Sequence, residues 1–313
     1  MTSGIKRIKT ANRDEWLALR SKYIGGSDAA AVIGLNPWAS PYSLWAEKTG
    51  KVPSFCGNLA TEVGTYLEDF VARKFEAETD KKVRRCNRSY LNSAYPWAIA
   101  NIDREIVGED AGLEIKTTDS INLKNFSGGE YPEQYYCQCI HYMAVTGKKR
   151  WYLAVLIGNR DFKWYTIERN EAEIAALMDT EREFWACVEK DSPPPIDGST
   201  ATTETLKTLY ADSDNDVTAD LFGQSQYLER YVELGDRIKE LEKLQNEAAN
   251  HVKEYMGRAA FGECDRYRVT WRATSRRTFD SKKFIADHPD IDMSGYYRAS
   301  STRAFRVAKQ KGE

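Results

Sequence analysis

The sequence has few histidines and no clustered cysteines, and these absences narrow the chemistry that it can carry. Its 313 residues include only three histidines, too few for a zinc site or a histidine-base enzyme. The six cysteines are scattered, and the close pair Cys137 and Cys139 matches neither a zinc-binding Cys-x₂-Cys pair nor a redox motif. They also lack the clustered spacing of a four-cysteine iron–sulfur site. Any metal chemistry therefore falls to carboxylates.

Long apolar runs are absent as well. No stretch approaches the roughly 18 residues that a membrane-spanning helix needs, and the basic, polar N-terminal region lacks the apolar centre of a signal peptide. An apolar content of 42% and a charged content of 29% are typical of an ordinary soluble protein. We therefore expect a cytoplasmic protein with no membrane partner, long enough for one large domain or two smaller ones.

The net charge is only −2, which argues against a protein that is basic overall and binds nucleic acid for that reason. The distribution of charge is more informative than the sum. Basic residues crowd positions 6–22 and again 266–283, whereas acidic residues dominate the middle of the chain. This pattern suits local contact with a phosphate backbone and a cation site elsewhere. Solvated charged faces explain it almost equally well.

The stretch from Pro96 to Thr118 carries the most specific chemistry. It predicts two short strands, the first ending at Asp103 and the second containing Glu114-Ile115-Lys116. Because side chains alternate along a strand, Glu114 and Lys116 share one face and Ile115 points into the core. Two acids and a lysine would then converge at one sheet edge, where the carboxylates suit Mg²⁺ and Lys116 could hold or polarise an attacking water. An acid after a strand and an exposed Glu-Ile-Lys strand are also common in α/β proteins, so this stretch alone leaves both interpretations open.

The residues before this stretch predict helices. A short helix over 12–21 is followed by Gly25-Gly26-Ser27, where the glycines permit a tight turn and Ser27 can cap an alanine-rich helix that ends at Gly34. Unpaired N–H groups at such a helix N-terminus favour a phosphate. As structure alone, the segment is simply a capped helix.

The remainder of the first 192 residues alternates between helices and strands. Helices are predicted over 40–50, 58–77, 132–147 and 171–190, and strands over 86–91, 98–102, 113–116, 151–157 and 162–167. This order implies an α/β fold in which helices cover both faces of a mixed sheet. Glu68, in the 58–77 helix, is by itself most simply a solvent-facing acid.

The composition changes after the prolines at 193–195. Residues rich in Ser, Thr and Asp predict a linker over 193–223. Apolar residues then recur in alternating four- and three-residue steps, a heptad pattern that predicts a long helix over 224–257. This helix could pair with a symmetry mate, bind another protein or pack on the first domain.

The last segment, 258–313, predicts a small basic α+β module. Its arginines and lysines are interleaved with Tyr267, Trp271 and Phe279. This composition suits nucleic acid, because arginine contacts phosphate and aromatic rings stack on bases.

Taken together, the motifs of the first domain resemble the lambda-type phage exonucleases, or YqaJ-like viral recombinase family, within the PD-(D/E)xK nuclease superfamily. The resemblance covers about residues 16–189. The motifs, in family order, are Trp16-x₃-Arg20, Gly26-Ser27-Asp28, Gly64-x₃-Glu68, Asp103, Glu114-Ile115-Lys116, and Gln138 before His141-Tyr142-Met143. Asn101-Ile102-Asp103 departs from the Pro-Asp pair that names the superfamily. The resemblance implies a PD-(D/E)xK nuclease core over 1–192, with a central mixed sheet flanked by helices.

The resemblance also implies a role for each motif residue. The groups that would bind one or two Mg²⁺ or Mn²⁺ ions are the side chains of Glu68, Asp103 and Glu114 and the carbonyl of Ile115. Lys116 would position or activate the water. Arg20 and Ser27 match family positions that grip the terminal 5′-phosphate of the strand being degraded. Gln138 matches a motif glutamine near the active site.

The implied activity is that of a metal-dependent 5′→3′ exonuclease on linear double-stranded DNA, leaving a 3′ overhang for a RecT-like single-strand annealing partner. By analogy, the protein would form a ring-shaped homo-oligomer around the duplex, as a phage or prophage protein in the cytoplasm of a bacterial host. Two alternatives stay open: a PD-(D/E)xK endonuclease in repair or restriction, and a non-catalytic DNA-binding recombination factor. The intact set of Asp103, Glu114 and Lys116 argues against the last.

Overall fold

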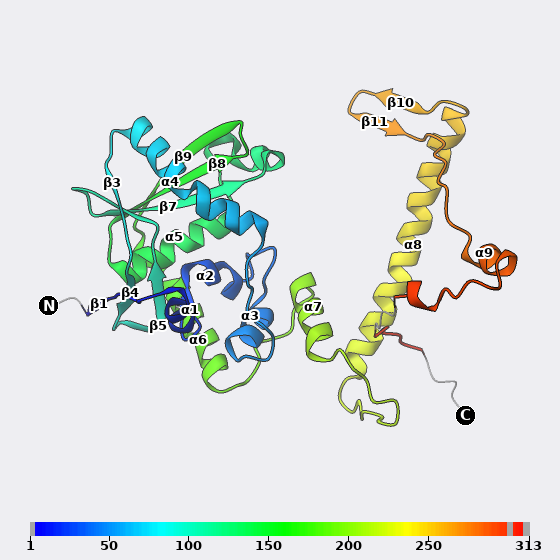
Figure 1. Ribbon diagram of the computed structural model, residues 1–313, viewed down its shortest axis with the longest axis horizontal. Coiled ribbons are helices and arrows are strands. Elements are labelled where there is room, and N and C mark those ends of the chain that lie inside the picture. The colour runs from blue at the N-terminus through cyan, green and yellow to red at the C-terminus, as the bar shows by residue number, and fades with distance from the viewer. Residues whose placement is uncertain (1–3, 299–302, 309–313) are drawn as a thin grey trace. The chain divides into compact units, whose positions relative to one another are not determined.

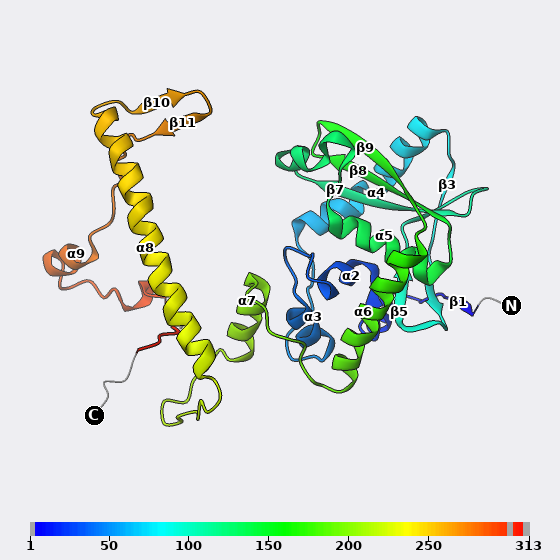
Figure 2. The same ribbon diagram turned by 180° about the vertical axis from the view of Figure 1, so that it is seen from behind.

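The computed structural model describes residues 4–298 and 303–308 and divides into two compact units. The first unit ends at Ala211 and the second begins at Asp212. Figures 1 and 2 show the elements of each unit from opposite sides. Within the described ranges, no helix combines the length and the apolar character that crossing a membrane requires.

Two β-sheets organise the first unit (Figure 1), with strand orders β1-β4-β5-β2 and β3-β6-β7-β8-β9. The strands are β1 (Ile5–Ile8), β2 (Ile24–Gly25), β3 (Val83–Arg85), β4 (Ser89–Asn92), β5 (Tyr95–Asn101), β6 (Arg104–Ile106), β7 (Ala111–Thr118), β8 (Arg150–Ile157) and β9 (Asp161–Glu168). In the five-stranded sheet β7 and β8 run parallel and the other neighbours run antiparallel. The predicted mixed sheet is therefore confirmed, with a second, smaller sheet beside it.

Helices cover both faces of the five-stranded sheet, as predicted. The helices of this unit are α1 (Arg13–Arg20), α2 (Gly26–Val32), α3 (Pro41–Lys48), α4 (Leu59–Thr79), the 3₁₀ segment η1 (Ser120–Gly129), α5 (Glu133–Thr146), α6 (Glu171–Glu189) and α7 (Thr200–Leu209). On one face, Val71 and Phe75 of α4 share a hydrophobic cluster with Ile115. On the other, Met143 of α5 shares a cluster with Val155 of β8. Successive strand residues thus face different helices, which follows from the two-residue period of a strand.

The strand predicted over 86–91 is interrupted. Residues 83–85 form β3 in one sheet and residues 89–92 form β4 in the other, so 86–88 carry the chain between sheets. The Cys86 N–H donates to the Asp103 carbonyl (3.4 Å) at this crossing.

β7 lies in the middle of its sheet, so the predicted location of the site at a sheet edge is wrong. Short, charged strands such as β1 and β6 leave no recognisable sequence pattern.

The segment predicted as a linker contains helix α7, which belongs to the first unit. The Thr202 side chain is buried, and its hydroxyl lies 2.8 Å from the Ser40 hydroxyl at the start of α3. Leu206 packs against a hydrophobic cluster that includes Trp45. The first unit therefore extends beyond the predicted boundary at 192, because a threonine-rich segment can bury its hydroxyls when they bond to one another.

The second unit contains the predicted long helix and small α+β module. Its elements are α8 (Ser225–Met256), the hairpin β10 (Phe261–Cys264) and β11 (Tyr267–Thr270), α9 (Ser281–Asp287) and the 3₁₀ turn η2 (Ser294–Tyr296). No residue of α8 is buried, and the ring of Tyr231 meets that of Phe305 edge-on, with centroids 5.3 Å apart. What the heptad face of α8 binds stays a prediction.

A buried ion pair in the first unit ties α5 to α6. His141 and Glu181 are both fully buried, with His141 Nδ1 2.8 Å from Glu181 Oε1 and His141 Nε2 3.0 Å from the Ile99 carbonyl oxygen. The Ile99 carbonyl can only accept, so Nε2 carries a proton, and a second proton lies between Nδ1 and the Glu181 carboxyl group. Burial lowers the pKa of His141, but the Glu181 carboxylate outweighs burial and the net shift is upward. Burial raises the pKa of Glu181 as well, against the opposing charge of His141.

We expect His141→Leu to lower the free energy of unfolding by about 3–5 kcal/mol, because it leaves the Glu181 carboxylate buried without a partner. Urea denaturation of the full chain measures this loss. The double variant His141→Leu/Glu181→Met removes both charges and should be more stable than His141→Leu alone. A double variant that loses the sum of the two single losses would contradict the ion pair.

Candidate active site

A cavity of about 420 Å³ in the first unit collects every site residue that the sequence predicts. Those residues are Arg20, Ser27, Glu68, Asp103, Glu114, Ile115, Lys116 and Gln138. They come from α1, α2, α4, the β5–β6 connection, β7 and α5. Residues far apart in the chain therefore line one cavity.

Asp103 occupies the short connection between β5 and β6. Its Oδ2 accepts the backbone N–H of Ile115 on β7 (2.8 Å), which fixes the carboxylate beside Glu114. Burial, and after it the charge of Glu114, raises the pKa of Asp103 well above its ordinary value. Asp103 and Glu114 thus share one cavity, where a cation would relieve the repulsion between their ionised forms.

Glu114 and Lys116 project from the same face of β7, as predicted. Lys116 Nζ lies 2.6 Å from Glu114 Oε1, and the same oxygen accepts a hydrogen bond from Gln138 Nε2 (2.7 Å). Lys116 Nζ also lies over the ring of Tyr135, 5.5 Å from its centroid. Glu114 is 2% exposed, and among the described residues its Oε2 has no hydrogen-bond partner. One buried carboxylate oxygen is therefore left for a ligand.

Lys116 is positively charged in this arrangement. Burial lowers the pKa of Lys116, but Glu114 and Asp103 outweigh burial and the net shift is upward. Burial raises the pKa of Glu114, against the opposing charge of Lys116. An ammonium group has three N–H donors and no acceptor. Lys116 is therefore suited to orienting a water or a phosphate oxygen rather than to accepting a proton.

Glu68 lines the cavity from α4, but its carboxylate is bound by Arg104. The Arg104 side chain is 4% exposed and also donates to Asp69 (2.6 Å). Arg104 is absent from the predicted site, although it directly follows Asp103. In the ranges that the structure describes, no three Asp, Glu, His or Cys side chains form a metal-binding group. Glu68 would have to give up its ion pair with Arg104 to become a third ligand of a metal ion.

Arg20 and Ser27 meet directly in the cavity. Arg20 Nη2 donates to Ser27 Oγ (2.5 Å) and lies 3.6 Å from Asp28, which is also 2.7 Å from Lys48 Nζ. The prediction that Ser27 caps α2 is wrong, because the N-cap is Gly25, whose N–H donates to Asp28 (3.0 Å). The Arg20 side chain is 34% exposed, and its guanidinium offers charge-assisted donors to a phosphate.

Gln138 links the two sides of the site. Its Nε2 donates to Glu114 and to the Tyr142 hydroxyl (2.8 Å), one helical turn further along α5. The Tyr142 ring lies so close to Gly26 that a Cβ there would approach Tyr142 Cε1 to 2.5 Å. Gln138 therefore orients the Glu114 carboxylate, and glycine is required where α2 passes α5. Spacing of four residues on a helix is the sequence signal for the Gln138–Tyr142 contact.

The donor set fits a hard divalent cation. Asp103 and Glu114 supply carboxylate oxygens, the ligands that Mg²⁺ and Mn²⁺ prefer. Glu114 Oε2 is buried and lacks a hydrogen-bond partner in the described part of the chain. A cation bound there would satisfy that oxygen and reduce the repulsion between the two acids.

Comparison with known proteins places this site in a family. The model of the YqaJ-like viral recombinase domain matches residues 15–149. The YqaJ protein of Bacillus subtilis (strain 168) is 40% identical over 300 residues, which cover 93% of this chain and 94% of that protein. Protein D345L of African swine fever virus (strain Badajoz 1971 Vero-adapted) is 42% identical over 55 residues, or 18% of this chain and 16% of that protein.

The solved structures to which this chain is similar include an alkaline exonuclease from Laribacter hongkongensis. It is 20% identical, with a TM-score of 0.47, over 57% of this chain and 94% of that chain. A phage-related exonuclease from Haemophilus somnus 129PT is 10% identical, with a TM-score of 0.41, over 56% of this chain and 99% of that chain.

The fold and the cavity define a mixed α/β protein with two carboxylates and a lysine on and beside a central strand. The chain belongs to the YqaJ-like viral recombinase family, as the extended match to the Bacillus subtilis protein shows. The family resemblance carried by the sequence motifs is thereby confirmed.

Proposed function

We propose that the protein is a metal-dependent 5′→3′ exonuclease that degrades one strand of linear double-stranded DNA and leaves a 3′ overhang. The observation that carries the proposal is the single cavity that holds Asp103, Glu114 and Lys116 together with the Arg20–Ser27 pair. Residues suited to hydrolysis and an arginine suited to binding the end of a strand therefore line the same cavity. Membership of a viral recombinase family supports the proposal.

Each residue of the site has a distinct role in the proposed hydrolysis. Mg²⁺ or Mn²⁺, held by Asp103, Glu114 and the Ile115 carbonyl, with Glu68 as a further ligand, would act as a Lewis acid and lower the pKa of a bound water. Lys116 donates hydrogen bonds that orient the attacking water or a phosphate oxygen. Gln138 holds the Glu114 carboxylate in place.

Arg20 and Ser27 would set the polarity of degradation. A guanidinium binds phosphate through charge-assisted, often bidentate hydrogen bonds. Asp28 and Trp16 steady Arg20, the latter with its ring 5.5 Å from the guanidinium carbon. A terminal 5′-phosphate bound by Arg20 and Ser27 would leave the first phosphodiester bond beside the carboxylates.

Partners follow from the proposed product. A 3′ single strand requires a RecT-like annealing protein for recombination, and a ring-shaped homo-oligomer around the duplex would explain processive degradation. A PD-(D/E)xK endonuclease is the second candidate, since Asp103, Glu114 and Lys116 would serve it equally well. The Arg20–Ser27 pair favours the exonuclease, because an enzyme that cuts within a strand needs no terminal phosphate.

We expect Lys116→Ala to reduce nucleotide release from 5′-phosphorylated linear duplex by at least about 100-fold, because no donor then orients the water. The assay contains Mg²⁺ and compares linear with covalently closed circular DNA. Lys190→Ala, an exposed lysine at the end of α6, is the matched control and should retain full activity. Undiminished degradation by Lys116→Ala rejects the mechanism, and cutting of closed circles favours the endonuclease.

Arg20→Gln should reduce the preference for 5′-phosphorylated over 5′-hydroxyl ends by roughly 10–100-fold, the value of a hydrogen bond to a charged group. Initial rates on two duplexes that differ only in the 5′ group measure this ratio. Arg13→Gln, an exposed position on the same helix, is the control. Equal end preference in Arg20→Gln and the parent protein would remove Arg20 from end recognition.

Mn²⁺ without DNA should raise the midpoint of thermal unfolding, with stabilisation of about 2.7 kcal/mol when the ion is at 100 times its Kd. Asp103→Asn should abolish this rise without destabilising the metal-free protein, because it removes one of two repelling carboxylates. Asp179→Asn, on the exposed surface of α6, should respond like the parent. The same Mn²⁺ effect in Asp103→Asn would exclude Asp103 as a ligand.

A further inference from the structure

A second cavity of about 420 Å³ lies between the edge strands β1 and β3 of the two sheets. Its charged lining consists of Arg7, Lys9, Arg84, Arg85, Arg88 and Glu105, which we call the basic cleft. Five cations and one carboxylate give the cleft an excess of positive charge, although the whole chain has a net charge of −2. None of its residues belongs to the predicted active site.

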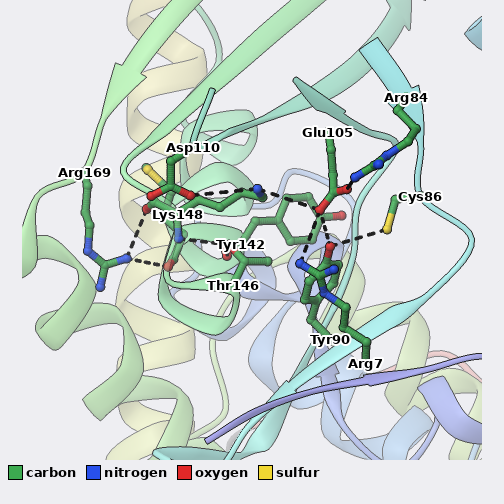
Figure 3. Close-up of polar contacts among 11 residues, drawn as sticks. Arg7, Arg84, Cys86, Tyr90, Glu105, Asp110, Tyr142, Thr146, Lys148 and Arg169 are labelled. Atoms are coloured by element: carbon green, nitrogen blue, oxygen red, sulfur yellow. Dashed lines mark hydrogen bonds and ion pairs between the residues drawn. The ribbon is translucent and has the colours of Figure 1, made fainter. Parts of the chain in front are cut away.

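Glu105 holds the base of the cleft together (Figure 3). Its carboxylate accepts hydrogen bonds from the Tyr90 hydroxyl and from Arg84 Nη2 (2.6 Å), and lies 3.7 Å from Arg7 Nη2 and 3.8 Å from Lys148 Nζ. Burial raises the pKa of Glu105, but the hydrogen bonds from Tyr90 and Arg84 outweigh burial and the net shift is downward. Glu105 is thus an ionised anchor that fixes the surrounding cations.

The cations above this anchor keep most of their hydrogen-bonding capacity. The side chains of Arg7 and Arg84 are 50% and 70% exposed. A guanidinium has five N–H donors, and Glu105 occupies only some of them. Lys9 and Arg88 are exposed and make no ion pair within the described residues. The cleft therefore presents cationic N–H donors that Glu105 leaves unused.

The basic cleft adjoins the active-site cavity. Arg85 lines the cleft, and its Nη2 lies 3.1 Å from Asp69 and 3.9 Å from Glu68, which lines the active-site cavity. The neighbouring Cys86 N–H donates to the Asp103 carbonyl. A polynucleotide with one phosphate at Asp103 would thus have further phosphates within reach of the cleft.

We propose that the basic cleft binds phosphodiester groups of the DNA whose end occupies the active-site cavity, an inference that rests on the proposed nuclease function. Contacts to several phosphates along a backbone fix register and orientation without reading sequence. An acidic peptide would find the same charges, but the shared Arg85–Glu68 boundary with the hydrolytic site favours a polymer that spans both cavities.

The test compares DNA binding by two full-length double variants with equal loss of charge. Lys9→Gln/Arg88→Gln removes cleft cations that hold no carboxylate, so folding is unaffected. Arg160→Gln/Lys190→Gln removes exposed cations that also lack an ion pair in the described part of the chain. Affinity for a 5′-phosphorylated linear duplex is measured by fluorescence anisotropy in EDTA over a series of NaCl concentrations, so that no cleavage is needed.

The cleft variant should bind more weakly than the parent, and its slope of log affinity against log salt should be shallower by about 1.8, the value for two lost phosphate contacts on duplex DNA. The control variant should keep the parent slope. The proposal is overturned if the cleft variant keeps the parent slope, or if the slopes of the cleft and control variants become shallower by the same amount.

Thermal unfolding in millimolar inorganic phosphate tests whether the cleft binds free phosphate rather than the phosphodiester groups of DNA. If phosphate stabilises the parent but not the cleft variant, while the DNA slopes are equal, the cleft holds free phosphate and the proposal is rejected. Cleavage is assayed separately in Mg²⁺. A parent that binds DNA through the cleft but degrades none would refute the nuclease function and leave the cleft assignment standing.

Discussion

The closeness of Asp103 to the buried Glu114 is the constraint on which the site depends. Two carboxylates that share one cavity repel each other when both are ionised, and each remaining group of the site offsets that repulsion. The Ile115 N–H binds Asp103, while Lys116 and Gln138 bind one oxygen of Glu114. The second Glu114 oxygen has no such partner in the described residues. This unpartnered oxygen of the buried Glu114 is the atom that the proposed cation would bind.

Arginines organise the acids that surround this pair. Arg104 is buried between the sheet and α4, where it neutralises Glu68 and Asp69, and Arg85 reaches the same two acids from the neighbouring strand. The acidic cavity and the basic cleft are thereby joined by a shared set of ion pairs. The net charge of −2 therefore conceals two adjacent regions that differ in charge: a cavity lined by three acids, one arginine and one lysine, and a cleft lined by five cations and one acid.

The sequence predicted the larger elements and the chemical identity of the site. Long periodic segments such as α6, α8 and the apolar β8 have many residues that report the same structure, and all three were found as expected. Strands β1 and β6 have four and three residues, so they contain too few positions for a pattern. Helix α7 resembled a linker because its buried side chains are the threonines Thr202 and Thr205, while its packed leucines are only partly buried.

The sequence by itself determined that Glu114 and Lys116 share a face, because the two-residue period of a strand is a local property of the backbone. It also determined which residue types are available for metal and phosphate. Only the tertiary structure decided that β7 is central, that Arg104 binds Glu68 and that Arg20 rather than a helix N-terminus meets Ser27. The position of β7 and the two side-chain contacts depend on strand order and on the packing of different elements against each other. A local sequence pattern encodes neither.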